Sequence, residues 1–499
     1  MGIPSYYKKT IENYPEIIIP DKYFNQKIDY LFLDLNCAIH PCCSGKTDVN
    51  EMYESIFSKI LECISLTKVQ ELVYIAIDGP APRTKMEQQR QRRLKSSQED
   101  KIWDTNQITP GTPFMDHLSE YLHQRCKELN VQWIISDSNE PGEGEHKIMH
   151  YMDTLSVDTH NIVYGLDADL LMLSMIRKHH VYLLRERTAF NIENLETPYV
   201  FCDIQCLKKS LLSTLQKESI HISNETLLND YLLMCFLIGN DFIINTPSIN
   251  IRYNGLEHLL DIYHTLQEEY FGRFFLIDEN AKINLHYFKV YIKKLSLKER
   301  GKINDTLMIR NNQQKKYQRM YRKIYDKYKP EKVEDITFEK MSELDEDTFK
   351  EFQNHSPVLL RENENEIFKS KRNYYMYHFY DTFNSNPSYD MVLDTDKKKL
   401  CEEYIRSIVW TTEYYFEKCK NWKWYYPYHF TPLLVDLSEY LDQLDTLDII
   451  NTEEIPHTPE EQLKIVLPFQ EDTYLYPLKT PLHSVFKRYY WECHPIMPH

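Results

Sequence analysis

Short runs of apolar residues, each followed by polar or acidic residues, recur along the first third of the chain. The runs are rich in β-branched and aromatic side chains, and their length and polar flanks predict buried strands. Four such strands are expected, at residues 28–36, 70–78, 131–137 and 161–167.

Helical spacing of apolar positions fills the segments between these strands. The predicted helices cover residues 51–66, 83–97, 113–129 and 145–156. Alternation of strand and helix at this spacing predicts an α/β fold, in which a parallel sheet is covered by helices on both faces.

The pattern changes in the second half of the chain. Residues 225–239 predict a buried helix, and residues 284–327 a basic helical stretch. Residues 329–368 are acidic and poorly periodic, which is typical of a linker or insertion. Long helical patterns and many aromatic residues return from about residue 370.

Composition limits the function classes only in part. The 499 residues carry a net charge of −16, so overall charge does not indicate nucleic-acid binding, although local positive charge is compatible with it. One of the longest apolar runs, residues 231–239, is far short of the ~20 residues that span a bilayer. We expect no membrane partner, a cytoplasmic location with a nuclear one left open, and reduced thiols at all 11 cysteines.

Acidic residues follow the predicted strands and the buried helix. Acids at the carboxyl ends of parallel strands converge on one edge of the sheet, where α/β proteins bind ligands. So many carboxylates cannot all ionise without cations, and a pair of Mg²⁺ ions (with Mn²⁺ as a substitute) is the simplest partner. A role as turn formers is the alternative. The candidate catalytic and metal-binding residues are Asp34, Asp78, Glu143, Glu145, Asp167, Asp169 and Asp241.

A basic helix is predicted five residues after Asp78. Lys85, Gln89, Arg92 and Arg93 fall at i, i+4, i+7 and i+8 and therefore share one helix face. One ammonium, one amide and two guanidinium groups suit a terminal phosphate. A solvated charged face is the alternative, but the neighbouring acid favours phosphate binding.

Aromatic side chains gather at residues 422–430. Trp422 and Trp424 cannot share a helix face, so at least one is a candidate to stack on unpaired bases, as is His40 near Asp34. Burial in the core is the alternative for the tryptophans, and a structural role is the alternative for His40.

These motifs together resemble the 5′→3′ exoribonucleases of the Xrn family. The resemblance spans most of the chain and is carried by strings in the family's order. They include Met1-Gly-Ile-Pro, Leu33-Asp-Leu-Asn, Asp78-Gly-Pro-Ala-Pro-Arg-Thr-Lys, Pro141-Gly-Glu-Gly-Glu-His-Lys, Gly165-Leu-Asp-Ala-Asp, Gly239-Asn-Asp-Phe and Trp422-Lys-Trp-Tyr-Tyr-Pro-Tyr.

The resemblance implies a PIN/flap-nuclease-like catalytic domain at residues 1–300, a helical and acidic linker or insertion at 301–369, and a mainly helical second conserved region at 370–499 that closes the active-site pocket. It implies a two-Mg²⁺ site on the seven acids, a 5′-monophosphate pocket on the basic helix face, and base stacking by His40 and one tryptophan. The chain ends near the end of the second conserved region, so we expect a compact member.

The implied activity is processive 5′→3′ hydrolysis of single-stranded RNA with a 5′-monophosphate end, releasing nucleoside 5′-monophosphates in RNA decay. We expect a monomer, with any decapping or RNA-decay partners unidentified. Two alternatives stay open: a flap-type structure-specific DNA nuclease and a catalytically silent RNA-binding scaffold.

Overall fold

The computed structural model describes residues 3, 5–97, 102–187, 197–217, 221–330, 336–337, 339–359, 364–380, 387–428, 430–447 and 453–467. Part of the predicted second conserved region, residues 468–499, therefore lies outside the described residues.

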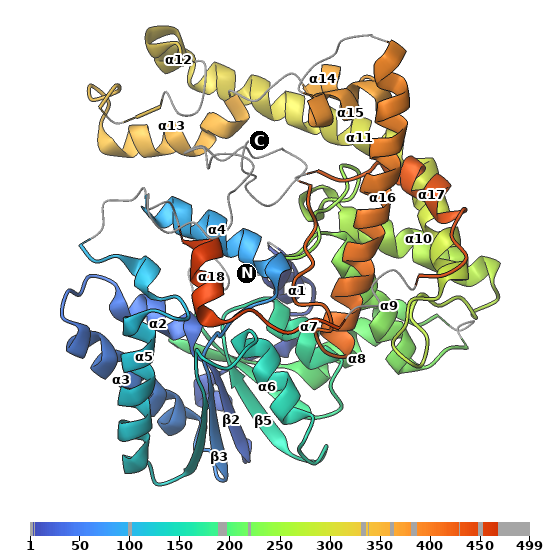
Figure 1. The fold of residues 1–499 in the computed structure, drawn as a ribbon. Helices are drawn as coiled ribbons and strands as arrows, with labels where there is room; N and C mark the ends of the chain where they lie inside the picture. The colour runs from blue at the N-terminus through green and yellow to red at the C-terminus, as the bar shows by residue number, and fades with distance from the viewer. Residues whose placement is uncertain are drawn as a thin grey trace.

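A seven-stranded sheet forms the core of the first half of the described chain (Figure 1). Its order is β1-β7-β6-β5-β2-β3-β4. Strands β6, β5, β2, β3 and β4 are parallel to one another. Strand β7 pairs antiparallel with β6, and β1 pairs antiparallel with β7 at the edge of the sheet. The strands are β1 (Ile18–Pro20), β2 (Tyr30–Asp34), β3 (Leu72–Ala76), β4 (Gln132–Ser136), β5 (His160–Tyr164), β6 (His180–Glu186) and β7 (Tyr199–Asp203).

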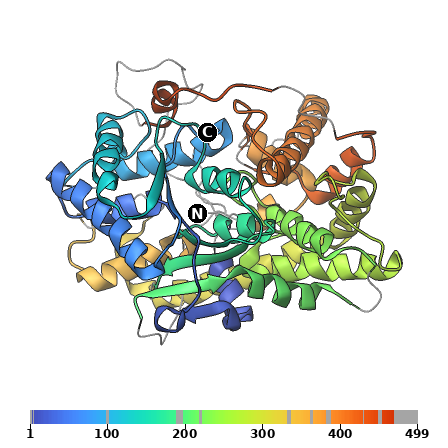
Figure 2. The same ribbon diagram turned by 90° about the horizontal axis from the view of Figure 1, so that it is seen from below.

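Helices cover both faces of this sheet, as Figure 2 shows from below. Alternate side chains of β2 point to opposite faces, so Phe32 joins one apolar cluster while Leu31 and Leu33 join another. The cluster of Leu31 is covered by α3 and α5, and that of Phe32 by α6, α7 and α8. The helices of this half are α1 (Tyr6–Asn13), α2 (Asn36–Cys43), α3 (Val49–Thr67), α4 (Arg83–Ser97), α5 (Pro113–Arg125), α6 (Gly144–Met152), α7 (Asp169–Met175) and α8 (Ile204–Leu215).

The second half is helical and lies beside and above the sheet (Figure 1). Its longest helices, α11 and α16, run at the top and down the right of that view. The helices are α9 (Asn224–Leu237), α10 (Gly255–Glu269), α11 (Leu285–Met320), α12 (Arg322–Tyr328), α13 (Glu346–Leu359), α14 (Glu364–Ile367), α15 (Lys371–Tyr380), α16 (Pro387–Phe416), α17 (Leu434–Leu441) and α18 (Pro459–Val466).

The two halves share one apolar core and several buried hydrogen bonds. Phe236 of α9, Tyr404 and Trp410 of α16 belong to the same cluster as Phe32 of the sheet. Helix α18 packs on α4, where the backbone N–H of Ala81 donates to Gln462 Oε1 at 2.7 Å. The helical half is therefore held directly against the carboxyl edge of the sheet.

The acidic middle segment has a small core of its own. Tyr321, Met341, Phe349 and Phe352 cluster between the end of α11 and α13. Helix α11 runs without a break across residue 300. The division of the chain into domains at 300/301 and 369/370 stays a prediction.

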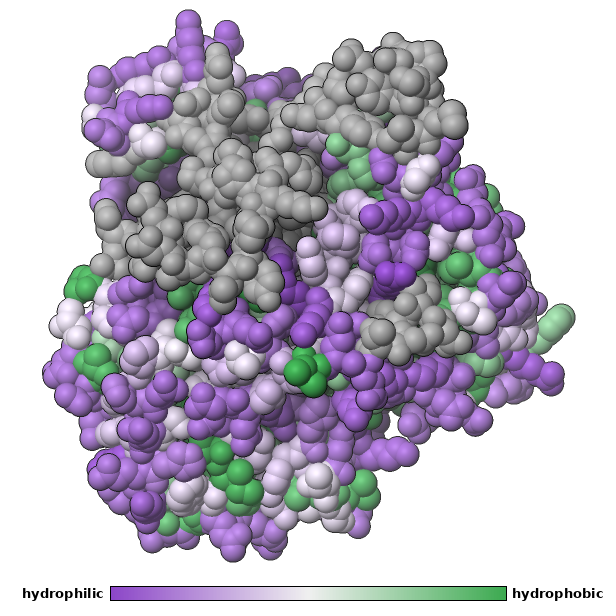
Figure 3. All heavy atoms as spheres, viewed as in Figure 1, coloured by the Kyte–Doolittle hydropathy of each residue, from purple (hydrophilic) through white to green (hydrophobic). Residues whose placement is uncertain are grey.

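The predicted fold class is confirmed: a mainly parallel α/β sheet with a helical region packed against it. The four predicted strands and the helices between them are present, whereas the sequence patterns did not indicate β1, β6 and β7. Ten cysteines in the described residues are free thiols. No described helix is long and apolar enough to cross a membrane, and the face drawn in Figure 3 is mainly hydrophilic with scattered apolar patches.

Candidate active site

Four of the seven predicted acids stand at the carboxyl ends of neighbouring parallel strands. Asp34 is the last residue of β2, and Asp78 follows two residues after β3. Asp167 lies between β5 and α7, and Asp169 is the first residue of α7. Because β3, β2 and β5 are adjacent, these carboxylates reach the same edge.

Two more acids are delivered by the start of α6. Glu143 precedes the helix and Glu145 lies in its first turn, where the helix dipole favours negative charge. The buried Lys147 ammonium fixes this segment by donating to the carbonyl oxygens of Ile77 at 2.8 Å and Asp137 at 2.7 Å.

The acids from the strands and from α6 meet around Gly144. Its backbone N–H donates to Asp78 Oδ1 at 2.6 Å. A Cβ atom at Gly144 would lie 2.7 Å from Asp34 Oδ1, so no larger residue fits without moving that carboxylate. Ligand oxygens of Glu145, Asp167 and Asp169 all lie within 4.8 Å of one another.

Asp241 joins the cluster through a buried lysine. The ammonium of Lys85 lies 2.7 Å from Asp241 Oδ2 and 2.7 Å from Glu143 Oε1. Gln88 also donates to Asp241. All seven predicted acids are therefore brought together. Lys85, which was predicted to bind phosphate, lies among them as a counter-ion.

Burial and mutual repulsion make this cluster costly to ionise. Burial, followed by Asp78, raises the pKa of Asp34 to about 8, and burial, followed by Asp241, raises the pKa of Asp169 to about 6. Burial and the Asp169 carboxylate also raise the pKa of Glu145 well above its usual range. Both carboxylate oxygens of Asp169 are buried, and Tyr415 is a neighbouring hydrogen-bonding side chain. Such a donor set fits divalent cations, which would supply the missing positive charge.

Two supporting residues were missed by sequence reasoning. Arg185 of β6 donates to the carbonyl oxygen of Asp167 at 3.0 Å and to that of Leu166, and its guanidinium lies 3.9 Å from the centroid of the Tyr7 ring. Tyr414 of α16 donates from its hydroxyl to Glu143 Oε2 at 2.9 Å. Neither role has a local signal, because each partner is distant in sequence.

A cavity of about 820 Å³ joins the acids to the predicted basic face. Gln89, Arg92 and Arg93 line it together with Lys85 and five of the acids. Arg92 Nε and Nη2 are buried without an acceptor among the described residues. Burial, then the neighbouring Arg92, lowers the pKa of Arg93 to about 10. Unpaired guanidinium donors beside a cavity suit an anionic ligand.

Of the three aromatic residues that were predicted to stack on bases, only His40 lines the cavity in the described part of the chain. His40 is exposed and lines the cavity. Trp422 and Trp424 are not among the lining residues: their carbonyl oxygens accept from Arg83 N at 2.8 Å and Thr84 Oγ1 at 2.9 Å at the start of α4. Their role in stacking stays a prediction. Trp103, which sequence reasoning did not single out, does line the cavity.

Sheet order and the acid cluster at its carboxyl edge define an α/β protein with a carboxylate site. Residues 1–102 and 95–187 match the family profile "XRN 5'-3' exonuclease N-terminus", and residues 221–478 match the profile "Xrn1 helical domain". The chain belongs to the Xrn family.

Similar curated proteins carry exoribonuclease names. The chain is 29% identical to "5'-3' exoribonuclease 1" of Homo sapiens, with 94% of this chain and 30% of that protein covered. It is 27% identical to the Saccharomyces cerevisiae protein of the same name, with 97% and 40% covered, and 26% identical to "5'-3' exoribonuclease 2 homolog" of Drosophila melanogaster, with 94% and 64% covered. The chain thus spans less than two thirds of these relatives' length.

Solved structures show only a distant likeness. The catalytic core of Rad2 in complex with DNA is 16% identical, with a TM-score of 0.34 over 54% of this chain and 72% of that chain. A likeness this weak carries no argument about function.

Proposed function

We propose that this protein is a processive 5′→3′ exoribonuclease that hydrolyses single-stranded RNA from a 5′-monophosphate end and releases nucleoside 5′-monophosphates. One observation carries the proposal: a single cavity is lined both by the carboxylate cluster and by the basic face of α4. Family membership and the names of the relatives support it.

The seven acids would hold two Mg²⁺ ions, with Mn²⁺ as a substitute. When bound, such a pair activates water and stabilises the leaving oxygen of a phosphodiester. Residues of the chain orient this site: Arg185 fixes the loop that carries Asp167, Tyr414 fixes Glu143, and Gly144 leaves room for Asp34.

The basic face would select the RNA end. Gln89, Arg92 and Arg93 line the cavity next to the acids, so a terminal phosphate held there places the first phosphodiester near the carboxylates. His40 lines the same cavity and would stack on a leading base. Larger 5′ groups, such as a triphosphate or a cap, would be excluded by size.

The cellular setting follows from the same proposal. We propose a role in RNA decay, a monomeric enzyme, and a cytoplasmic location with a nuclear one left open. Partners in decapping or decay are unidentified.

The test compares decay of end-labelled RNAs that carry a 5′-monophosphate, a 5′-triphosphate or a 5′-hydroxyl, with Mg²⁺ and with EDTA. Wild-type protein should degrade the monophosphate RNA fastest, in a Mg²⁺-dependent manner, and release mononucleotides. Asp167→Ala should lose hydrolysis but keep RNA binding. Arg92→Ala should lose the preference for monophosphate over hydroxyl ends.

Arg125→Ala is a matched control, because Arg125 pairs with Glu128 at 3.1 Å on the far end of α5, outside the cavity. Retained Mg²⁺-dependent turnover in Asp167→Ala would remove the metal assignment. An unchanged ratio of rates in Arg92→Ala would remove the phosphate pocket. Cleavage of flapped DNA duplexes in preference to RNA, or RNA binding without hydrolysis, would favour the two alternatives.

A further inference from the structure

The proposed mechanism leaves one buried imidazole at the acid cluster without a role. His146, next to Glu145 in the first turn of α6, is only 4% exposed. Its Nε2 atom is buried and has no hydrogen-bond partner in the part of the chain that the structure describes. A neutral imidazole carries one ring nitrogen with a free lone pair, which can bind a metal ion. A buried polar atom of this kind calls for a partner.

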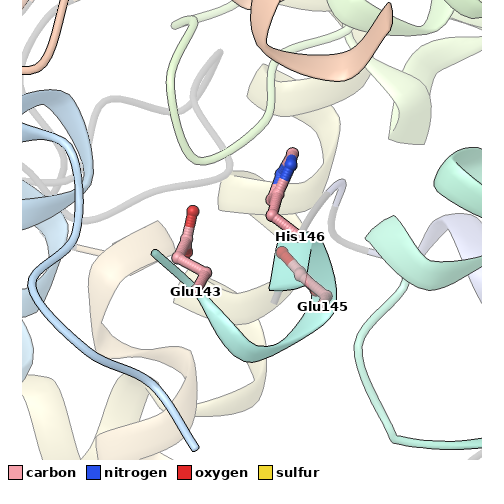
Figure 4. Close-up of side chains that lie close together, drawn as sticks. All are labelled: Glu143, Glu145 and His146. Atoms are coloured by element: carbon pink, nitrogen blue, oxygen red, sulfur yellow. The ribbon is translucent and has the colours of Figure 1, made fainter. Parts of the chain in front are cut away.

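The neighbours of His146 are two of the proposed metal ligands. Figure 4 shows Glu143, Glu145 and His146 on the loop and first turn of α6. One ligand atom from each lies within 4.8 Å of the other two. Two ligands of one ion are at most about 4.2 Å apart when each is ~2.1 Å from it, so these side chains must move closer together to bind one ion.

One residue of the helical region positions two members of this set. The Tyr414 ring stacks on His146 with centroids 3.7 Å apart and planes inclined by 21°. The hydroxyl of the same residue donates to Glu143 Oε2 at 2.9 Å. Phe242 packs edge-on against Tyr414 at 5.4 Å. The imidazole and the carboxylate are therefore held in place by one rigid aromatic group.

Glu145 also belongs to the second group of close ligands, with Asp167 and Asp169. That group offers oxygen atoms alone, whereas the group with His146 includes a nitrogen. The competing cation at the mixed group is Lys85, 2.7 Å from Glu143 Oε1. Its contact with Asp241 would keep the ammonium paired if an ion bound to Glu143.

We propose that His146, with Glu143 and Glu145, forms a mixed nitrogen–carboxylate position for a divalent cation, beside an all-carboxylate position that shares Glu145. This inference rests on the proposed function insofar as that function assigns Glu143 and Glu145 to metal. Imidazole suits transition-metal cations, whereas Mg²⁺ prefers oxygen. The two positions are therefore unequal: the all-carboxylate one suits Mg²⁺, whereas the mixed one accepts transition-metal cations, for which Mn²⁺ serves as a spectroscopic probe.

The experiment uses Mn²⁺ as the probe and electron spin echo envelope modulation as the readout, because a directly bound nitrogen gives a characteristic modulation. Wild-type protein loaded with Mn²⁺ should show nitrogen modulation, and labelling of histidine with ¹⁵N should change it. His146→Phe keeps a flat ring against Tyr414 and should lose the modulation. Its Mn²⁺ affinity should fall by about tenfold or more, the range seen when even an outer contact to a ligand is lost.

His150→Phe is the matched control, since His150 lies one turn further along α6, and it should keep the modulation. The proposal is overturned if Mn²⁺-loaded wild-type protein shows no nitrogen modulation, or if the modulation survives in His146→Phe. If His146→Phe does not fold, the labelled wild-type protein decides: no change on ¹⁵N labelling overturns the proposal. Failure of the proposed function would instead appear as absent Mg²⁺-dependent hydrolysis of 5′-monophosphate RNA, which is measured separately.

Discussion

Replacing Lys85 with methionine removes an ammonium that bridges two acids of the cluster. In the folded protein its Nζ lies 2.7 Å from Glu143 Oε1 and 2.7 Å from Asp241 Oδ2, and the side chain is 7% exposed. Burial alone lowers the pKa of Lys85, but Asp241 and Glu143 outweigh it and raise the pKa well above its usual range. The ammonium is therefore charged and compensates the cluster.

The loss of unfolding free energy in Lys85→Met follows from the burial of its partners. Removing one partner of a buried ion pair costs about 3–5 kcal/mol, because the other charges stay buried. Protonation of the acids offsets part of this, since the pKa of Asp34 is already raised to about 8. We therefore expect Lys85→Met to lose about 3 kcal/mol of unfolding free energy in EDTA. Saturating Mg²⁺ should reduce the stability difference between wild type and Lys85→Met. The reduction is about 1.4 kcal/mol for each tenfold by which the variant binds Mg²⁺ more tightly than wild type.

The assay is urea unfolding followed by circular dichroism, with EDTA and with saturating Mg²⁺. Lys59→Met is the control, because Lys59 pairs with Glu62 and Glu186 at 2.8 Å and 3.0 Å on a different part of the sheet domain. Its loss should be the same with and without Mg²⁺. The reasoning is refuted if Lys85→Met is as stable as wild type in EDTA, or if Mg²⁺ leaves its deficit unchanged.

Four further substitutions test the site and the packing of the helical region. Gly144→Ala places a methyl group 2.7 Å from Asp34 Oδ1, so RNA hydrolysis should fall by about 10²-fold while the urea midpoint changes little. Gly301→Ala, with nothing within 4 Å of the new methyl group, should instead stabilise α11 by about 0.5–1 kcal/mol with unchanged activity; equal hydrolysis rates in the two variants would contradict the steric argument. Burial raises the pKa of Glu299 from 4.5 to about 7, so its contribution to stability is present below about pH 4.5 and is lost as the pH rises through 7. The unfolding free energy of Glu299→Gln in urea titrations should therefore rise by up to about 3 kcal/mol relative to wild type between pH 4.5 and pH 7. A difference that does not change with pH would refute the raised pKa of Glu299. Tyr414→Phe removes a hydroxyl that donates to a proposed metal ligand, and calorimetric Mg²⁺ affinity should drop by about tenfold; an unchanged affinity would show that this contact does not orient the ligand.

Local periodicity was enough to predict the main elements of the first half. The strand ending at Asp34 and the helix of residues 83–97 were both predicted, because side-chain spacing follows directly from strand and helix geometry. Strands β1, β6 and β7 were missed. Their pairing at the edge of the sheet depends on contacts that no local pattern encodes.

The sequence by itself determined which acids reach the carboxyl edge, since parallel strands that end in Asp34 or shortly before Asp78 and Asp167 must present them on the same side. Only the tertiary structure decided how those acids are compensated and held. Lys85 bridges acids from two segments, and Tyr414 comes from a helix about half the chain length away. Such contacts depend on how distant elements pack, whereas spacing along the chain records only which residues share a strand or a helix face.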